Sequence, residues 1–238
     1  GMTGPGTMRD EIVNILGVPD NDMIGETGKA HDMEKAKRVL AEFVAREKNI
    51  DVYLQCSVFD VIQEGLLVKG LLLASNEGIL ALLAHTFIDA TGDGIVAFLA
   101  GAHVEKGRDD GLMQPVTLEF RIEGVDESRG IVCIGDVDTV ELNGMRFLDY
   151  CKQCADEGKL PQHLAAVRLH PCTRPGERQV NTTQVNRIDS THIADLFPAD
   201  IELRQQIDLL VDFLRKNVPG YENIRCIQSG TTTGIRES

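Results

Sequence analysis

The chain has 238 residues, of which 42% are hydrophobic and 26% are charged, a composition typical of a folded globular protein with one or two domains. Its formal net charge of -13 repels phosphate backbones and anionic lipids, which argues against nucleic acid or a membrane surface as the main partner. No apolar run reaches the ~20 residues of a membrane span and no secretory signal opens the chain. We therefore expect a cytoplasmic protein whose 6 cysteines are reduced.

Two helices are predicted before the first strand. The earlier one covers residues 9–16 and ends before Gly17 and Pro19. The stronger one runs from Asp32, a plausible N-cap, to Glu47. Its apolar stripe consists of Val39, Leu40, Phe43 and Val44.

Short strand-like runs follow this helix. They are Val52–Cys56, Val58–Ile62, Leu66–Leu73, Ile79–Leu83 and Thr86–Ala90. Glu64-Gly65 and Asn76-Glu77-Gly78 supply the tight turns that antiparallel strands require, so the middle three runs predict a small meander. The last run leads into small residues and a short predicted helix over Ile95–Ala102.

The second half of the chain begins after a charged turn at Arg108–Gly111, the first credible domain boundary. Alternating apolar residues predict strands over Pro115–Glu123 and Arg178–Val185. Helices are predicted over Asn143–Glu157 and Ile201–Lys216. Pro198 is expected to open the second of these helices, and Pro219-Gly220 to close it.

The strongest candidate for a binding site is the segment Ile88–Gly94, with the sequence Ile-Asp-Ala-Thr-Gly-Asp-Gly. A strand that ends in small residues and leads into a helix exposes backbone N–H groups, which a phosphate or a flat ring can approach without meeting a Cβ. The alternative is an ordinary strand-to-helix turn that needs glycine at positive φ. Spacing alone leaves both interpretations open.

The order of these elements resembles the FAD-dependent oxidoreductases of the glutathione-reductase-like flavoprotein class, and more narrowly a bacterial group of them. The resemblance covers roughly residues 32–238. The motifs that carry it are Asp-Ala-Thr-Gly-Asp-Gly at 89–94, Gln114–Leu118, Asn181-Thr182-Thr183, Val218–Glu222 and Gly234–Ser238. Each motif alone is weak, and it is their combination that is specific.

The resemblance implies an α/β fold: a partial FAD/NAD(P)-binding Rossmann-like domain with an antiparallel meander, plus a mixed-sheet α+β substrate domain. The implied boundaries are 1–112 for the partial FAD-binding domain, 113–229 for the substrate domain and 230–238 for the return to the first domain. FAD is the implied cofactor, and hydride transfer between an unknown small substrate and the flavin is the implied reaction. The implied cofactor-binding residues are Val58, Thr91, Gly92, Asp93, Gly94, Arg236 and Glu237.

The chain also departs from the family pattern. The family begins with a strand and Gly-x-Gly-x-x-Gly, whereas Gly4-Pro5-Gly6 follows no strand and its proline has no N–H to offer a phosphate. The family continues beyond Arg-Glu-Ser, where this chain stops. We therefore expect a fragment or a truncated member that associates with itself to cover an exposed sheet edge. The alternative is a non-catalytic binding or interaction module that has lost its cofactor site.

Other polar groups are weaker candidates, and no metal site is expected. Cys151 and Cys154 have C-x-x-C spacing, but two ordinary helix cysteines are the expected interpretation. His192 and Asp195 are either an acid–base pair or part of a loop. The remaining candidates are a metal site that adds His163, His170 and Cys172, and a carboxylate site or solvated loop formed by Arg168, Arg174 and Arg178.

Overall fold

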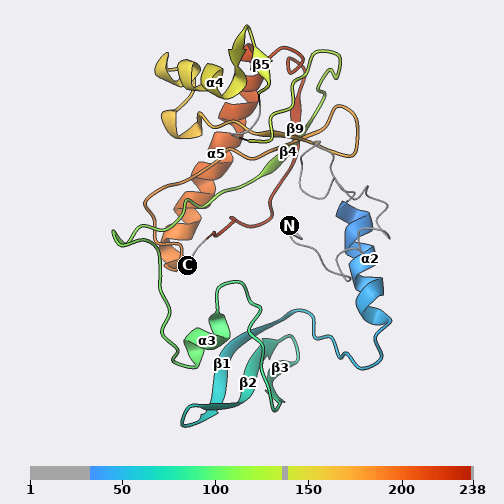
Figure 1. Ribbon diagram of the computed structural model, residues 1–238, viewed down its shortest axis with the longest axis vertical. Coiled ribbons are helices and arrows are strands. Elements are labelled where there is room, and N and C mark those ends of the chain that lie inside the picture. The colour runs from blue at the N-terminus through green and yellow to red at the C-terminus, as the bar shows by residue number, and fades with distance from the viewer. Residues whose placement is uncertain (1–32, 136–138, 237–238) are drawn as a thin grey trace. The chain divides into compact units, whose positions relative to one another are not determined.

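A computed structural model describes residues 33–135 and 139–236 of the chain (Figure 1). The chain divides into two compact units. We call residues 47–113 the meander unit and residues 114–236 the core unit, with which the described residues 33–46 are grouped. The predicted helix over residues 9–16 lies outside the described residues. The stronger helix is confirmed as α2 (Met33–Ala45), in which Val39 is buried but Leu40 of the expected stripe is exposed.

The meander unit contains the predicted three-stranded meander. β1 (Cys56–Glu64), β2 (Leu67–Ser75) and β3 (Gly78–Leu83) form an antiparallel sheet in the order β1-β2-β3. The turns place Gly65 at φ 62° and Gly78 at φ 112°, values that a residue with a Cβ rarely adopts. The short helix α3 (Ile95–Leu99) packs against β1.

Two predicted strands of this unit are wrong. Residues 52–55 and 86–90 are not in strands, and β1 begins only at Cys56. A strand needs a neighbour for its backbone groups, and neither run has one in the described structure. Their apolar side chains stay in solvent, with Leu54 79% and Ile88 89% exposed.

The core unit is built on a four-stranded sheet, in the order β7-β8-β4-β9. β4 (Phe120–Glu123) and β8 (Arg178–Val180) are shorter than predicted, and β7 (Leu169–Pro171) and β9 (Arg225–Ser229) were not predicted. The expected mixed sheet is wrong, because every pairing between described strands is antiparallel. Antiparallel strands need no helical crossover between them, and the described residues therefore contain no parallel βαβ unit.

The helices of the core unit differ at their starts from the prediction. Asn143 and Gly144, at φ 55° and 75°, turn a hairpin between β5 (Glu141–Leu142) and β6 (Met145–Arg146), so α4 (Phe147–Asp156) begins later than predicted. A short 3₁₀ turn, η1 (Gln162–Leu164), follows. The long helix α5 (Ile193–Asn217) begins five residues before Pro198, which lies inside it.

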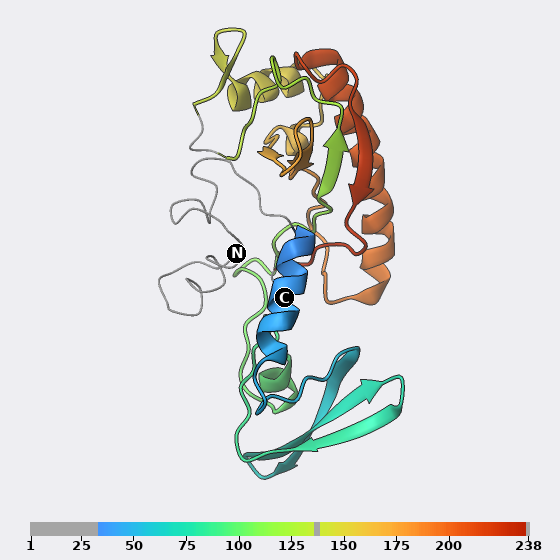
Figure 2. The same cartoon turned by 90° about the vertical axis from the view of Figure 1, so that its right-hand side faces the viewer.

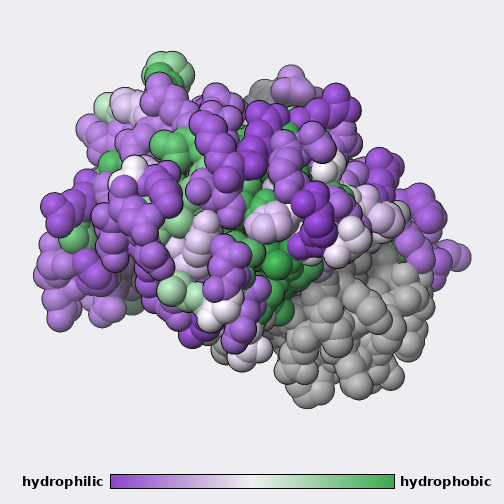
Figure 3. Space-filling view, turned by 90° about the horizontal axis from the view of Figure 1, so that it is seen from above, coloured by the Kyte–Doolittle hydropathy of each residue, from purple (hydrophilic) through white to green (hydrophobic). Residues whose placement is uncertain are grey.

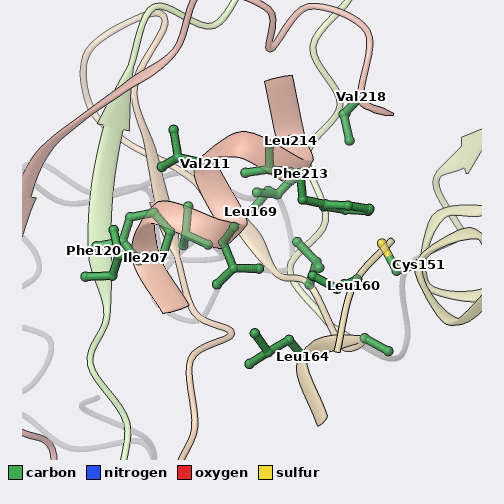
Figure 4. Packing of buried hydrophobic residues seen from close by; sticks show 14 of the residues in the cluster. Phe120, Cys151, Leu160, Leu164, Leu169, Ile207, Val211, Phe213, Leu214 and Val218 are labelled. Atoms are coloured by element: carbon green, nitrogen blue, oxygen red, sulfur yellow. The ribbon is translucent and has the colours of Figure 1, made fainter. Parts of the chain in front are cut away.

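One face of the sheet and one side of α5 form the hydrophobic core. Val116, Leu118, Phe120 and Ile122 are at most 1% exposed, while the residues between them face the other way. Figure 2 shows β4 and β9 side by side with α5 next to them. Around Phe120 and Leu169, the α5 side chains Ile207, Val211 and Leu214 fill this core (Figure 4).

A second feature of the core unit is the tight crossing of residues 124–131 and 218–224. The backbone N–H of Asp126 donates to the carbonyl of Gly220 at 2.8 Å, and a Cβ on Gly220 would lie 2.6 Å from the nitrogen of Gly130. Buried Tyr221 donates its hydroxyl hydrogen to the carbonyl of Ile131 at 2.6 Å. The Val-Pro-Gly-Tyr-Glu motif therefore has a structural role, in which it holds these two segments of the core unit together.

The surface is mostly hydrophilic in the space-filling view, with apolar residues in a patch near its middle (Figure 3). Within the described ranges, no helix combines the length and the apolar character that crossing a membrane requires.

Candidate cofactor site

The site begins with the carboxylate of Asp89, in the loop between β3 and α3. Asp89 Oδ1 accepts hydrogen bonds from the N–H of Thr91 at 3.1 Å and from its hydroxyl at 2.7 Å. Asp89 Oδ2 accepts from the N–H of Ala97 at 2.9 Å, and Thr91 Oγ1 accepts from the N–H of Ile95 at 3.0 Å. Two side chains thus satisfy the first N–H groups of α3.

These hydrogen bonds hold Asp89 in its charged form. The backbone N–H of Ala97 and the hydroxyl and N–H of Thr91 lower the pKa of the Asp89 carboxyl below its usual value. The negative charge of the Asp89 carboxylate already lies beside the start of α3. A ligand phosphate would therefore not be favoured at this helix end. The sequence placed Asp89 in the predicted strand Thr86–Ala90 and in the candidate segment Ile88–Gly94, but did not indicate that its side chain caps α3.

The next residues form an open loop. Gly92 at φ 91° and Gly94 at φ 65° require glycine, and no atom lies within 4 Å of the place where a Cβ would stand on either. In the part of the chain that the structure describes, the N–H groups of Gly92, Asp93 and Gly94 donate no hydrogen bond. The Asp93 side chain is exposed. The loop therefore offers backbone donors and one carboxylate to an approaching ligand.

The same run has a spacing that the sequence reasoning overlooked. Gly92-Asp93-Gly94-Ile95-Val96-Ala97 matches the pattern Gly-x-Gly-x-x-Ala, a variant of the dinucleotide fingerprint. That fingerprint follows a strand of a parallel sheet, whereas residues 84–90 are not a strand here. The match therefore supports an open glycine loop, and nothing about a parallel sheet.

The other expected cofactor residues lie elsewhere. Val58 stands on β1 opposite Leu73 and is half-buried, within the same meander unit as the loop. Arg236 belongs to the core unit, where its Nε donates to Gln114 Oε1 at 3.2 Å. Glu237 lies outside the described residues. Which of these residues contact a cofactor stays a prediction.

The segments on either side of Gln114 and Arg236 are paired. The N–H of Thr117 donates to the carbonyl of Gly234 at 3.1 Å, and the N–H of Gly234 donates back at 2.7 Å. Thr183 supports the same region, because its hydroxyl both accepts from the N–H and donates to the carbonyl of Leu118, each at 2.8 Å. The Gln-Pro-Val-Thr-Leu, Asn-Thr-Thr and Gly-Ile-Arg motifs thus meet in one part of the core unit.

Two of the three arginines predicted to form a carboxylate site or a solvated loop, Arg174 and Arg178, have different partners. Arg178 is 2% exposed and forms a bidentate ion pair with Glu127 at 2.7 and 2.8 Å. Exposed Arg174 lies 3.8 Å from Glu177. For Arg178 both earlier interpretations are wrong, because a buried arginine that already binds a carboxylate is neither solvated nor available to a substrate.

The histidines and cysteines do not form a metal centre in the described structure, where no group of three possible ligands converges. Cys151 and Cys154 are buried in α4, and burial raises the pKa of the Cys151 thiol. This confirms two ordinary helix cysteines. His192 and Asp195 lie at the start of α5, with Nδ1 and Oδ1 3.5 Å apart.

The sequence of the chain matches the model of a known protein family. The family model described as FAD dependent oxidoreductase matches residues 6–238. The chain belongs to this family. FAD is accordingly its expected cofactor. A search of curated proteins finds no match.

Two solved structures are similar to this member of the FAD-dependent oxidoreductase family. One is a geranylgeranyl bacteriochlorophyll reductase-like protein from Thermoplasma acidophilum, with 17% identity and a TM-score of 0.45 over 84% of this chain and 41% of that one. The other is a triply substituted form of the flavin-dependent brominase Bmp2, with 14% identity and a TM-score of 0.43 over 86% of this chain and 44% of that one. The chain thus spans about two fifths of the length of each.

The described residues fit one part of FAD. The loop at 91–94 has room above both glycines, three N–H donors and an exposed carboxylate. Such a loop can bind the sugar-alcohol hydroxyls and the linker oxygens of a dinucleotide, which need both acceptors and donors. FAD, when bound, supplies the redox chemistry itself.

Proposed function

We propose that the chain functions as an FAD-dependent oxidoreductase that transfers hydride between a small substrate and the flavin. The observation that carries the proposal is the family match over residues 6–238, within which the open loop at 91–94 lies. The protein's part in such a reaction is to bind the flavin, orient the substrate and exclude water. The described residues provide groups for the first of these tasks.

Within this proposal, Asp93 binds a hydroxyl-bearing part of FAD and does not approach the pyrophosphate. Asp89 and Asp93 place two carboxylates within one short loop, and Asp89 is held in its ionised form. Two negative charges repel a pyrophosphate, whereas a carboxylate accepts strong hydrogen bonds from hydroxyl groups.

An FAD titration of the purified chain tests this assignment, followed by the quenching of flavin fluorescence. Asp93→Ala should weaken binding about tenfold, the loss expected for one hydrogen bond to a charged acceptor. Asp109→Ala is the matched control, since Asp109 is another exposed aspartate of the meander unit and its loss changes the net charge equally. Equal affinities of the two variants would remove Asp93 from the cofactor site.

A further inference from the structure

The face of the core sheet opposite α5 carries a row of polar side chains. In β4 the even-numbered residues Phe120 and Ile122 point into the core, so Arg121 points to the other face. Strand register places Gln179 of β8 and Gln228 of β9 directly beside Arg121. His170 of β7 lies beside Gln179 and extends the row across all four strands.

Arg121 has fewer partners than its chemistry allows. A guanidinium carries five N–H donors, yet the Nε of Arg121 is buried and donates no hydrogen bond within the described structure. Its Nη1 lies 3.9 Å from the Glu177 carboxylate, beyond hydrogen-bond distance. The side chain is 31% exposed and so remains reachable from solvent. A half-buried cation in this state favours an additional acceptor.

Three other arginines of the core unit each have a carboxylate partner, although the Nε of Arg178 is, like that of Arg121, buried without a hydrogen bond in the described structure. Arg178 forms the bidentate pair with Glu127, and Arg129 reaches both oxygens of Glu222 at 3.1 Å. Arg225 pairs with Glu123. Arg121 therefore differs from them in having no carboxylate at hydrogen-bond distance among the described residues.

The charges around Arg121 define the class of ligand. Glu119 accepts a hydrogen bond from Gln179 at 2.8 Å, and Glu177 lies between Arg121 and Arg174 at 3.9 and 3.8 Å. With Glu123 and Arg225, three carboxylates balance three guanidiniums on and beside this face. Such a face accepts one further negative charge more readily than the two or more of a phosphate ester, in a chain with a net charge of -13.

We propose that Arg121 binds the carboxylate of a small monocarboxylate substrate on this face of the sheet. Its planar guanidinium donates two parallel hydrogen bonds to the carboxylate, and the amides of Gln179 and Gln228 flank the ligand on either side. That the bound carboxylate belongs to a substrate rests on the proposed oxidoreductase function. The binding of a carboxylate does not, since all the groups involved belong to the core unit.

Saturation-transfer difference NMR with benzoate, on the full chain without added FAD, tests this site. Benzamide serves as the uncharged probe. The native chain should bind benzoate and not benzamide. Arg121→Gln should weaken benzoate binding at least tenfold, while Arg174→Gln, which removes the other guanidinium beside Glu177, should leave it unchanged.

A second variant keeps the test valid if Arg121→Gln fails to fold. Gln179→Glu places a carboxylate directly beside Arg121 in the sheet, where it should occupy the guanidinium and weaken benzoate binding by a similar factor. The proposal is overturned if the native chain does not bind benzoate, if benzamide binds equally well, or if Arg121→Gln and Arg174→Gln bind it alike. Because FAD is absent, a failure of flavin binding in a separate titration does not affect this result.

Discussion

At the level of single residues, burial determines which side chains are available to a ligand, and the sequence does not always show which residues are buried. Arg178 and Glu127 are 51 positions apart, and nothing in the sequence indicates that one binds the other. Arg178 therefore looked like one member of a basic cluster. Cys151 and Cys154 were easier to interpret, because residues three apart on an amphipathic helix share a face, and that face is buried.

Two of the 3 tyrosines should resist ionisation. Burial raises the pKa of Tyr221 to about 12 and that of Tyr150 to about 12, from the ordinary tyrosine value of 10.0. The folded chain favours the neutral tyrosine hydroxyl, so this group makes its full contribution to stability below pH 10. That contribution is lost as the pH rises towards 12. For fully buried Tyr221 the loss amounts to about 3 kcal/mol of unfolding free energy.

Unfolding by urea at a series of alkaline pH values, with tyrosinate absorbance as a second signal, measures this effect. Tyr221→Phe should reduce the loss of stability between pH 10 and 12, because one of the two shifted groups is gone. An unchanged pH dependence in this variant would show that Tyr221 ionises freely in the folded chain.

The Arg178–Glu127 pair should contribute strongly to stability. Glu127→Gln leaves the 2% exposed guanidinium without its counter-charge and should cost about 2–3 kcal/mol, less than a fully enclosed pair because Glu127 is 46% exposed. Glu222→Gln is the matched control, since its partner Arg129 is 53% exposed, and it should cost under ~1 kcal/mol. Similar urea midpoints for the two variants would contradict this difference.

Among the helices and strands, the tight turns could be predicted from the sequence, but which strands pair with each other could not. The meander followed from two glycine-containing turns between apolar runs, and both turns are present. Residues 86–90 have the composition of a strand but no described neighbour, whereas β9 has an unremarkable sequence and pairs with β4. Pro198 is the sixth residue of α5, beyond the first four N–H groups that lack a partner in any helix, so it removes one intrahelical hydrogen bond without ending the helix and marked no boundary.

Gly220 provides a test of the crossing between residues 124–131 and 218–224. Gly220 and Gly144 both have positive φ, 85° and 75°, but only at Gly220 would a Cβ meet backbone, 2.6 Å from the nitrogen of Gly130. Gly144→Ala should cost about 1–2 kcal/mol from backbone strain alone. Gly220→Ala should cost at least ~2 kcal/mol more, because the crossing must open. Thermal denaturation of both variants measures the difference, and equal melting temperatures would refute the close approach.

At the scale of the whole molecule, the two units differ in how well they cover their apolar residues. The core unit buries a large cluster, whereas Leu66, Ile79 and Leu83 of the meander unit are 102%, 71% and 70% exposed. The family and its cofactor were predictable because motifs are local in sequence. The sheet of the core unit was not, because its strands are short and distant in the chain.

We expect the chain to self-associate through β3, an edge strand of the meander with exposed apolar residues. Ile79 and Leu83 lie on the same face of β3, so Ile79→Lys with Leu83→Lys should disfavour association while leaving the antiparallel pairing with β2 intact. Light scattering over a range of concentrations should show larger species for the native chain than for this variant. A native chain that remains monomeric at high concentration would contradict the expectation.

We expect this chain to bind FAD through the loop at 91–94. An absorbance and fluorescence titration of the purified chain with FAD tests this binding directly. Because the chain contains no tryptophan, its fluorescence has no indole contribution. We predict a saturable change in the flavin spectrum of the native chain that Asp93→Ala weakens and Asp109→Ala does not. A flavin spectrum that does not change at any protein concentration would show that the chain does not bind FAD.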